Sequence, residues 1–222
     1  YGRSRGLGDV YKRQVLISIP SQSIAAYAQS DVSSDGVVVT QHYLATEIGE
    51  NILAQGGNAY DAAIAVGFAL AVVLPRAGNI GGGGFMVIYD KEANDTYAID
   101  YREKAPAASY RDMYLDENGE FDILKSTFGY SAIGVPGTVH GFWSVHQKFG
   151  SLPWADLIQP SIMLAERGFM MSDYMAETLS NYFEKMSYYD ETQNIFLKNY
   201  PNLKDSRSVS YTHLTLPTIP QV

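Results

Sequence analysis

The sequence predicts an α+β fold, and three of its stretches support that class. Apolar residues recur at four-residue spacing over residues 43–54, as on an amphipathic helix. Residues 60–74 are apolar almost all round, which is typical of a helix that is buried on most sides. Two β-type runs, 85–89 and 96–102, are joined through a polar segment and therefore predict a hairpin. A hydrophobic content of 46% over 222 residues is normal for a globular core.

Composition excludes several classes of function. The formal net charge is −8 and basic residues cluster only near the N-terminus, so no nucleic-acid partner is expected. Cysteine is absent, which removes disulfides, thiolate metal sites and a cysteine nucleophile. The four histidines lack metal-ligand spacing, so no metal and no cofactor are expected. The apolar stretch 60–74 is shorter than the about 20 residues that cross a bilayer, so no stable membrane span is expected.

The two ends of the chain differ from its middle. Residues 1–14 and 207–222 lack helix or strand periodicity and resemble translated sequencing adaptors, with natural tails as the alternative. Within residues 15–29, apolar residues lead into the small-x-small pattern at residues 26–28, which predicts the back half of a secretory signal peptide. A short amphipathic tail is the alternative. The signal predicts a periplasmic or secreted protein.

Between residues 36 and 74 the pattern predicts one strand and two helices. The β-branched run 36–40 predicts a buried strand. Glycines 56–57 are expected to end the first helix, because glycine accepts the left-handed conformation of a helix C-terminus. Asn58 is expected to cap the second helix, and Asp61 can return a hydrogen bond to it.

The second half of the chain is predicted to be mostly helical. Residues 107–130 are polar and rich in turn residues, so they predict a solvated excursion. Three helices are expected after it, over residues 138–148, 152–166 and 173–188. The native part of the chain is predicted to end near Asp205.

Four consecutive glycines, Gly81, Gly82, Gly83 and Gly84, separate the apolar helix from the hairpin. Without a Cβ they let the backbone come close to a ligand or to a neighbouring strand. A tight helix-to-strand connection is the alternative interpretation. A phosphate loop is excluded, because Phe-Met follows the glycines where such a loop needs Lys-Ser or Lys-Thr.

Arg102 ends the second predicted strand and is the main candidate for ligand binding. Strand alternation puts it on the face opposite Tyr101. Its planar guanidinium can hold a carboxylate through two parallel hydrogen bonds. A salt bridge to Glu103 or Asp100 is the alternative, and a direct pair with Glu103 requires the strand to end there, since neighbouring strand residues point to opposite faces.

Four motifs in order carry a resemblance to a known family. They lie at residues 56–63 (GGNAYDAA), 78–86 (GNIGGGGFM), 100–106 (DYREKAP) and 134–138 (GVPGT). Together they resemble the N-terminal part of the large subunit of gamma-glutamyltranspeptidase. The resemblance runs from about Gly36 to Asp205. One departure is Leu74-Pro75-Arg76, which stands where the family has a His-Pro-Gln type of sequence.

The resemblance implies the fold of an N-terminal-nucleophile hydrolase, a four-layer αββα sandwich that is incomplete in this fragment. It also implies a proenzyme that cleaves itself into a large and a small subunit. The new N-terminal Thr of the small subunit would transfer the γ-glutamyl group of glutathione to water or to an amino acid or peptide. That Thr lies outside this chain, so the fragment alone is predicted to be inactive.

The resemblance assigns roles to two residues of this chain. Arg102 corresponds to the arginine that holds the α-carboxylate of the γ-glutamyl group, and Glu103 to the acidic residue that supports it. A cephalosporin or glutaryl acylase of the same family is one alternative, against which Arg102 weighs because a glutaryl group lacks the matching α-amino-acid carboxylate. The other is a non-catalytic module in which Arg102 and the glycine loop hold an anionic ligand.

Overall fold

The computed structural model describes residues 36–78 and 80–194. The predicted adaptor segments 1–14 and 207–222, the predicted signal peptide 15–29 and the predicted native end near Asp205 lie outside these residues. The helices are α2 (Tyr43–Ala54), α3 (Ala59–Val73), α4 (Ile123–Thr127), α5 (Thr138–Phe149), α6 (Trp154–Arg167), α7 (Asp173–Asn181), α8 (Phe183–Met186) and α9 (Asp190–Thr192), with a 3-10 turn η1 (Tyr130–Ala132). The strands are β1 (Phe85–Asp90) and β2 (Asp95–Asp100).

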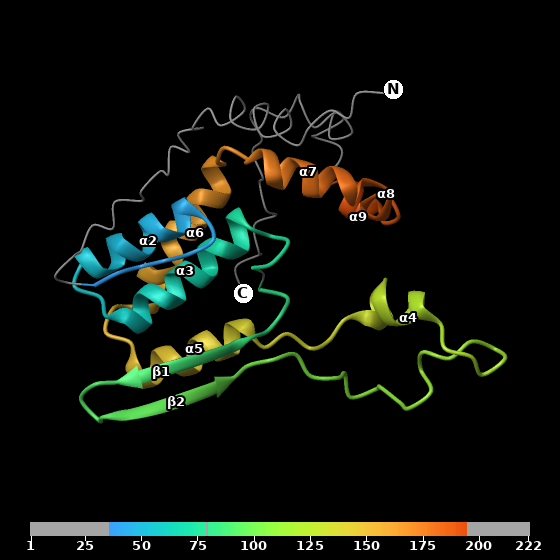
Figure 1. The fold of residues 1–222 in the computed structure, drawn as a ribbon, viewed down its shortest axis with the longest axis horizontal. Coiled ribbons are helices and arrows are strands. Elements are labelled where there is room, and N and C mark those ends of the chain that lie inside the picture. The colour runs from blue at the N-terminus through green and yellow to red at the C-terminus, as the bar shows by residue number, and fades with distance from the viewer. Residues whose placement is uncertain (1–35, 79, 195–222) are drawn as a thin grey trace, which may run out of the picture. The chain divides into compact units, whose positions relative to one another are not determined.

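Helix α3 is the centre of the hydrophobic core, as its sequence predicts. It packs against α2, α5 and α6 (Figure 1). Ile64 and Ala65 are fully buried, and Phe68 stacks edge-on against Phe142 of α5 and Trp154 of α6. Such a helix is apolar on nearly every side because it has neighbours on nearly every side.

A capping box begins α3, and it reaches further than the sequence indicates. Asn58 accepts hydrogen bonds from the first turn, and Asp61 accepts one from the Asn58 backbone N–H at 3.1 Å, both as predicted. The Asp61 carboxylate is fully buried and also accepts from the hydroxyl and backbone N–H of Ser151 and from the Leu152 N–H. One carboxylate therefore joins the start of α3 to the turn between α5 and α6.

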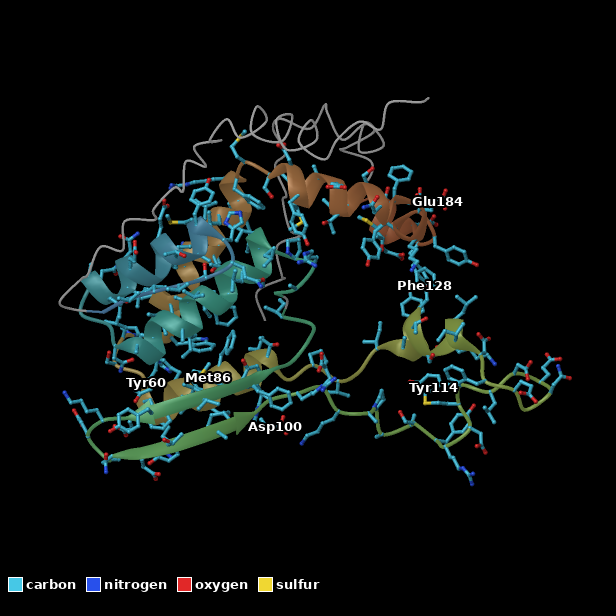
Figure 2. All side chains as sticks on the ribbon, in the orientation of Figure 1. Tyr60, Met86, Asp100, Tyr114, Phe128 and Glu184 are labelled. Atoms are coloured by element: carbon cyan, nitrogen blue, oxygen red, sulfur yellow. The ribbon has the colours of Figure 1, made fainter. Side chains whose placement is uncertain are left out.

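Strands β1 and β2 form an antiparallel hairpin in which Phe85 pairs with Asp100 and Asp90 with Asp95. One face, which includes Met86 (labelled in Figure 2), packs against the core that α3 and α5 contribute. The opposite face of β1 is apolar but exposed; its side chains are Phe85, Val87 and Tyr89. The hairpin thus has one covered and one open face.

The predicted strand over residues 36–40 is wrong. This segment has no strand structure, and Val37 and Val39 are 71% and 87% exposed. Val38 packs inward, against Gly49 of α2, and the Thr40 hydroxyl is hydrogen-bonded to that of Thr46. β-branched residues favour a pleated conformation, but a strand also needs a neighbour for its N–H and C=O groups. No described residue forms backbone ladder hydrogen bonds with this segment.

Two further predictions need adjustment in the helical half of the chain. The single helix predicted over 173–188 is divided into α7 and α8, because Tyr182 leaves helical backbone geometry at ψ 2°. The preceding Ser180 and Asn181 have low helix propensity, so a break there costs little free energy of folding. The excursion over 107–130 is largely exposed, as predicted, but it also contains α4.

His42 caps α2, and we expect it to make the stability of the folded chain depend on pH. Its Nδ1 accepts a hydrogen bond from the Leu44 N–H at 3.3 Å, and burial lowers the pKa of His42 below its ordinary value of 6.5. The unfolded chain therefore binds the proton first, so stabilisation present above about pH 6.5 is lost as the pH falls. Because His42 is half-buried, we expect a loss below about 1 kcal/mol.

Urea unfolding of wild type and His42→Asn between about pH 5 and pH 8 tests this, since asparagine caps helices without titrating in that range. The unfolding midpoint of the wild type should fall more steeply toward acid than that of the variant. Parallel pH profiles would contradict it.

Candidate functional site

Residues 101–104 follow β2 directly and lie between the glycine run and the segment that starts α5. The Tyr101 N–H donates to the Gly84 carbonyl at 3.0 Å. Lys104 and Val135 exchange two backbone hydrogen bonds, at 2.8 and 3.2 Å. The Gly82 carbonyl accepts from the Gly137 N–H at 2.9 Å, so the glycine run and the start of α5 are joined as well. The backbone on which Arg102 is carried is therefore held on two sides.

Glycine is required where the glycine run lies against the backbone of residues 101–103. A Cβ on Gly83 would lie 2.6 Å from the Tyr101 carbonyl oxygen and 2.8 Å from the Arg102 Cα. A Cβ on Gly84 would lie 2.9 Å from the Tyr101 ring. Gly81 lies in the turn before them, and Gly82 is buried. The loop thus makes the close backbone approach that four glycines permit.

The Arg102 side chain points into solvent, with 69% of its surface exposed. The backbone N–H of Arg102 donates to Asp100 Oδ1 at 3.0 Å, at the end of β2 where Asp100 is labelled in Figure 2. Its Nε lies 3.8 Å from Glu103 Oε2, and Glu103 is itself partly exposed. This pair exists because β2 ends at Asp100, which frees the next residues from strand alternation.

The pair between Arg102 and Glu103 is weak. An ion pair between exposed side chains contributes about 0–1 kcal/mol, and here it uses Nε rather than the paired Nη groups. Glu103 is the one carboxylate within 4.0 Å of the guanidinium among the residues that the structure describes. The fork of Arg102 is therefore available to a second carboxylate.

Sequence reasoning missed three residues that build this site. Gly134 lies against the Glu103 Cβ, and Gly137 against the Tyr101 carbonyl. Gly141 lies against the Tyr101 ring. The motif at 134–138 was a signal for the first two, but only the structure shows that they face the Arg102 segment.

Residues 74–76, where the sequence departs from the family pattern, make contacts away from the Arg102 segment. Leu74 is buried with Met171 and Met175. The Arg76 guanidinium lies 5.0 Å above the Tyr174 ring of α7. These residues therefore connect the end of α3 to α7.

The comparison with known families decides the family of this chain. The family model for gamma-glutamyltranspeptidase matches residues 45–214. The chain belongs to the gamma-glutamyltranspeptidase family. The match includes every motif that carries the resemblance, and it continues beyond the described residues.

Named relatives agree with this family. The chain is 46% identical over 187 residues to the glutathione hydrolase proenzyme of Bacillus subtilis, covering 84% of this chain and 32% of the relative. It is 41% identical over 201 residues to that of Escherichia coli, covering 88% and 34%. The chain thus spans about a third of the length of these relatives.

A solved structure shows the fold. The gamma-glutamyltranspeptidase of Helicobacter pylori aligns with a TM-score of 0.73 and 45% identity, over 76% of this chain and 48% of that one. The predicted fold class is confirmed: the chain is α+β and shares the fold of the N-terminal-nucleophile hydrolases of the gamma-glutamyltranspeptidase family. The described residues supply helices and a single hairpin of it.

Over the described ranges, no helix combines the length and the apolar character that crossing a bilayer requires. Nor do His, Asp and Glu gather there in groups of three that could hold a metal ion.

Proposed function

We propose that this chain is the N-terminal part of the large subunit of a γ-glutamyltransferase and glutathione hydrolase. In this proposal Arg102 holds the α-carboxylate of the γ-glutamyl donor. The observation that carries it is an exposed guanidinium, only weakly paired, on a backbone fixed by hydrogen bonds from the glycine run and from the start of α5.

The chemistry of arginine suits this task. Its fork donates two parallel hydrogen bonds to one carboxylate, and charge-assisted bonds of this kind are roughly twice as strong as neutral ones. Glu103 lies beside it and would orient the guanidinium when the site is empty. A donor carboxylate bound to both Nη groups of Arg102 would replace the single 3.8 Å contact between Arg102 Nε and Glu103. Binding of the donor is therefore favoured over the empty site.

The remainder of the machinery belongs in this proposal to the small subunit of the same precursor. An N-terminal Thr there would attack the γ-glutamyl amide of glutathione and pass the acyl group to water or to an amino acid or peptide. The open apolar face of β1 supports a further layer of chain over the hairpin, because Phe85, Val87 and Tyr89 are each at least 60% exposed.

We further propose export to the periplasm or the outside.

Arg102 separates this function from the acylase alternative, and self-cleavage separates it from the binding module. A glutaryl acylase would bind a side chain without an α-amino-acid carboxylate, which leaves the arginine without its partner. A non-catalytic module that holds an anion would use the same residue, but it would not process itself into subunits.

Extension of the reading frame followed by an activity assay tests the proposal. The full-length protein should cleave itself and release the amine from a γ-glutamyl anilide, whereas the 222-residue chain should not. Faster turnover of a glutaryl amide than of the γ-glutamyl donor would point to the acylase instead. An uncleaved and inactive full-length protein would leave only the binding module.

A further inference from the structure

The Tyr101 side chain occupies a narrow slot beside Arg102. Its ring lies edge-on to Phe142 of α5, with 5.7 Å between the ring centroids. A Cβ on Gly84 would lie 2.9 Å from one edge of the ring, and a Cβ on Gly141 would overlap the ring on the side of α5. The ring thus fills the space between the start of β1 and α5, where larger residues would displace it.

The Tyr101 backbone is confined as closely as its ring. Its carbonyl oxygen lies against Gly83 from the loop and against Gly137 from the start of α5. Its N–H is bonded to the Gly84 carbonyl at 3.0 Å. A residue held by its ring, its N–H and its carbonyl has little freedom to rotate.

We propose that Tyr101 is the positioning residue of the carboxylate site. Wedged between Gly84 and Gly141, its ring fixes the direction in which the next residue, Arg102, presents its guanidinium. Arg102 has few contacts of its own, since it is largely exposed and its ion pair is long. The direction of its side chain therefore depends on the backbone that Tyr101 anchors. This inference rests on the proposed function of Arg102.

The aromatic ring, rather than the hydroxyl, performs this task. Burial raises the pKa of Tyr101, so the hydroxyl is neutral near pH 7. No described residue accepts a hydrogen bond from the Tyr101 hydroxyl, whereas the Tyr89 hydroxyl donates to Asn94 Oδ1 at 3.0 Å. Phenylalanine keeps the ring that Gly84 and Gly141 enclose, whereas leucine leaves part of the slot empty.

The test compares two donors in the self-cleaved full-length enzyme, one γ-glutamyl amide and one analogue that lacks the α-carboxylate. Tyr101→Leu should raise KM for the γ-glutamyl amide on the order of tenfold to a hundredfold, because a misplacement of about 1 Å costs that much. It should leave KM for the analogue within about twofold, a selectivity that a general folding defect would not produce. Tyr101→Phe, which keeps the ring, should retain the donor selectivity of the wild type. Gly141→Ala, which pushes the ring from the other side, should act like Tyr101→Leu.

Tyr97→Leu is the matched control. Tyr97 lies on the same face of β2 and packs against Phe149 of α5 at 5.2 Å, but it is not adjacent to Arg102. It should not alter donor selectivity. Equal losses for both donors in Tyr101→Leu, or wild-type selectivity, would overturn the role of Tyr101. Arg102→Ala is measured alongside: if it leaves selectivity unchanged, the proposed function of Arg102 fails, independently of Tyr101.

Discussion

Arg102→Ala in the full-length enzyme is expected to raise KM for a γ-glutamyl donor while self-cleavage continues. A carboxylate clamp that is desolvated by its ligand contributes about 2 kcal/mol or more, which corresponds to roughly 30-fold in affinity. Self-cleavage should persist because the Arg102 side chain is exposed and contributes little to packing. Steady-state kinetics with the donor and gel analysis of the two subunits provide the measurement.

Arg111→Ala is the matched control for this substitution. Arg111 is also exposed and pairs with the next residue, Asp112, at 3.7 Å, but it lies in the polar excursion. Its loss should leave donor kinetics unchanged. Arg102→Lys should recover only part of the affinity, since lysine keeps the charge but lacks the two-pronged geometry. An unchanged KM in Arg102→Ala would refute the assignment.

Asp61→Ala is expected to destabilise the folded protein by roughly 3–5 kcal/mol. Removing the carboxylate leaves the Ser151, Leu152 and Asn58 N–H groups without their acceptor. Each buried donor that loses its partner costs about 1–3 kcal/mol, and these losses add in part. The link between the start of α3 and the turn before α6 is lost with them.

Urea unfolding measures this effect, and Asp156→Ala serves as its control. Asp156 also lies in the first turn of a helix but is exposed, so its loss should cost at most about 1 kcal/mol. Asp61→Asn should fall between the two, because an amide retains one acceptor oxygen. Similar unfolding midpoints for Asp61→Ala and Asp156→Ala would show that the buried carboxylate does not link these elements.

Local signals predicted much of the fold. The bounds of α2 and the Asn58 and Asp61 capping box follow from residues within one or two helical turns of each other. The inward face of β2 follows from alternation: Tyr97 and Ile99 pack on the core, as does Tyr101 just after the strand. In each case the side chains that decide the structure are near neighbours along the chain.

Contacts distant in sequence could not be predicted in this way. Asp61 meets Ser151 across 90 residues. Tyr101 meets Gly137 and Gly141 only once α5 has packed beside the hairpin. The wrong strand at 36–40 has the same origin, because the propensity of its β-branched residues is local whereas the partner that a strand needs is not.

The candidate site was likewise predictable only where it depends on residues that are adjacent in the sequence. The fork of Arg102 and the proximity of Glu103 can be read from two adjacent residues. The frame that holds them comes from the glycine run, Gly134 and Gly137, which converge only in the folded chain. Motif order indicated that these segments belong together, but not which atoms meet.

A crystal structure of the full-length enzyme with a γ-glutamyl donor bound tests the role of Arg102 most directly. We expect both Nη atoms of Arg102 to lie about 2.7–2.9 Å from the two oxygens of the donor α-carboxylate, as in a bidentate pair. The Tyr101 ring should remain between Gly84 and Gly141. A donor carboxylate bound by other residues, with Arg102 still paired to Glu103, would contradict the proposed function.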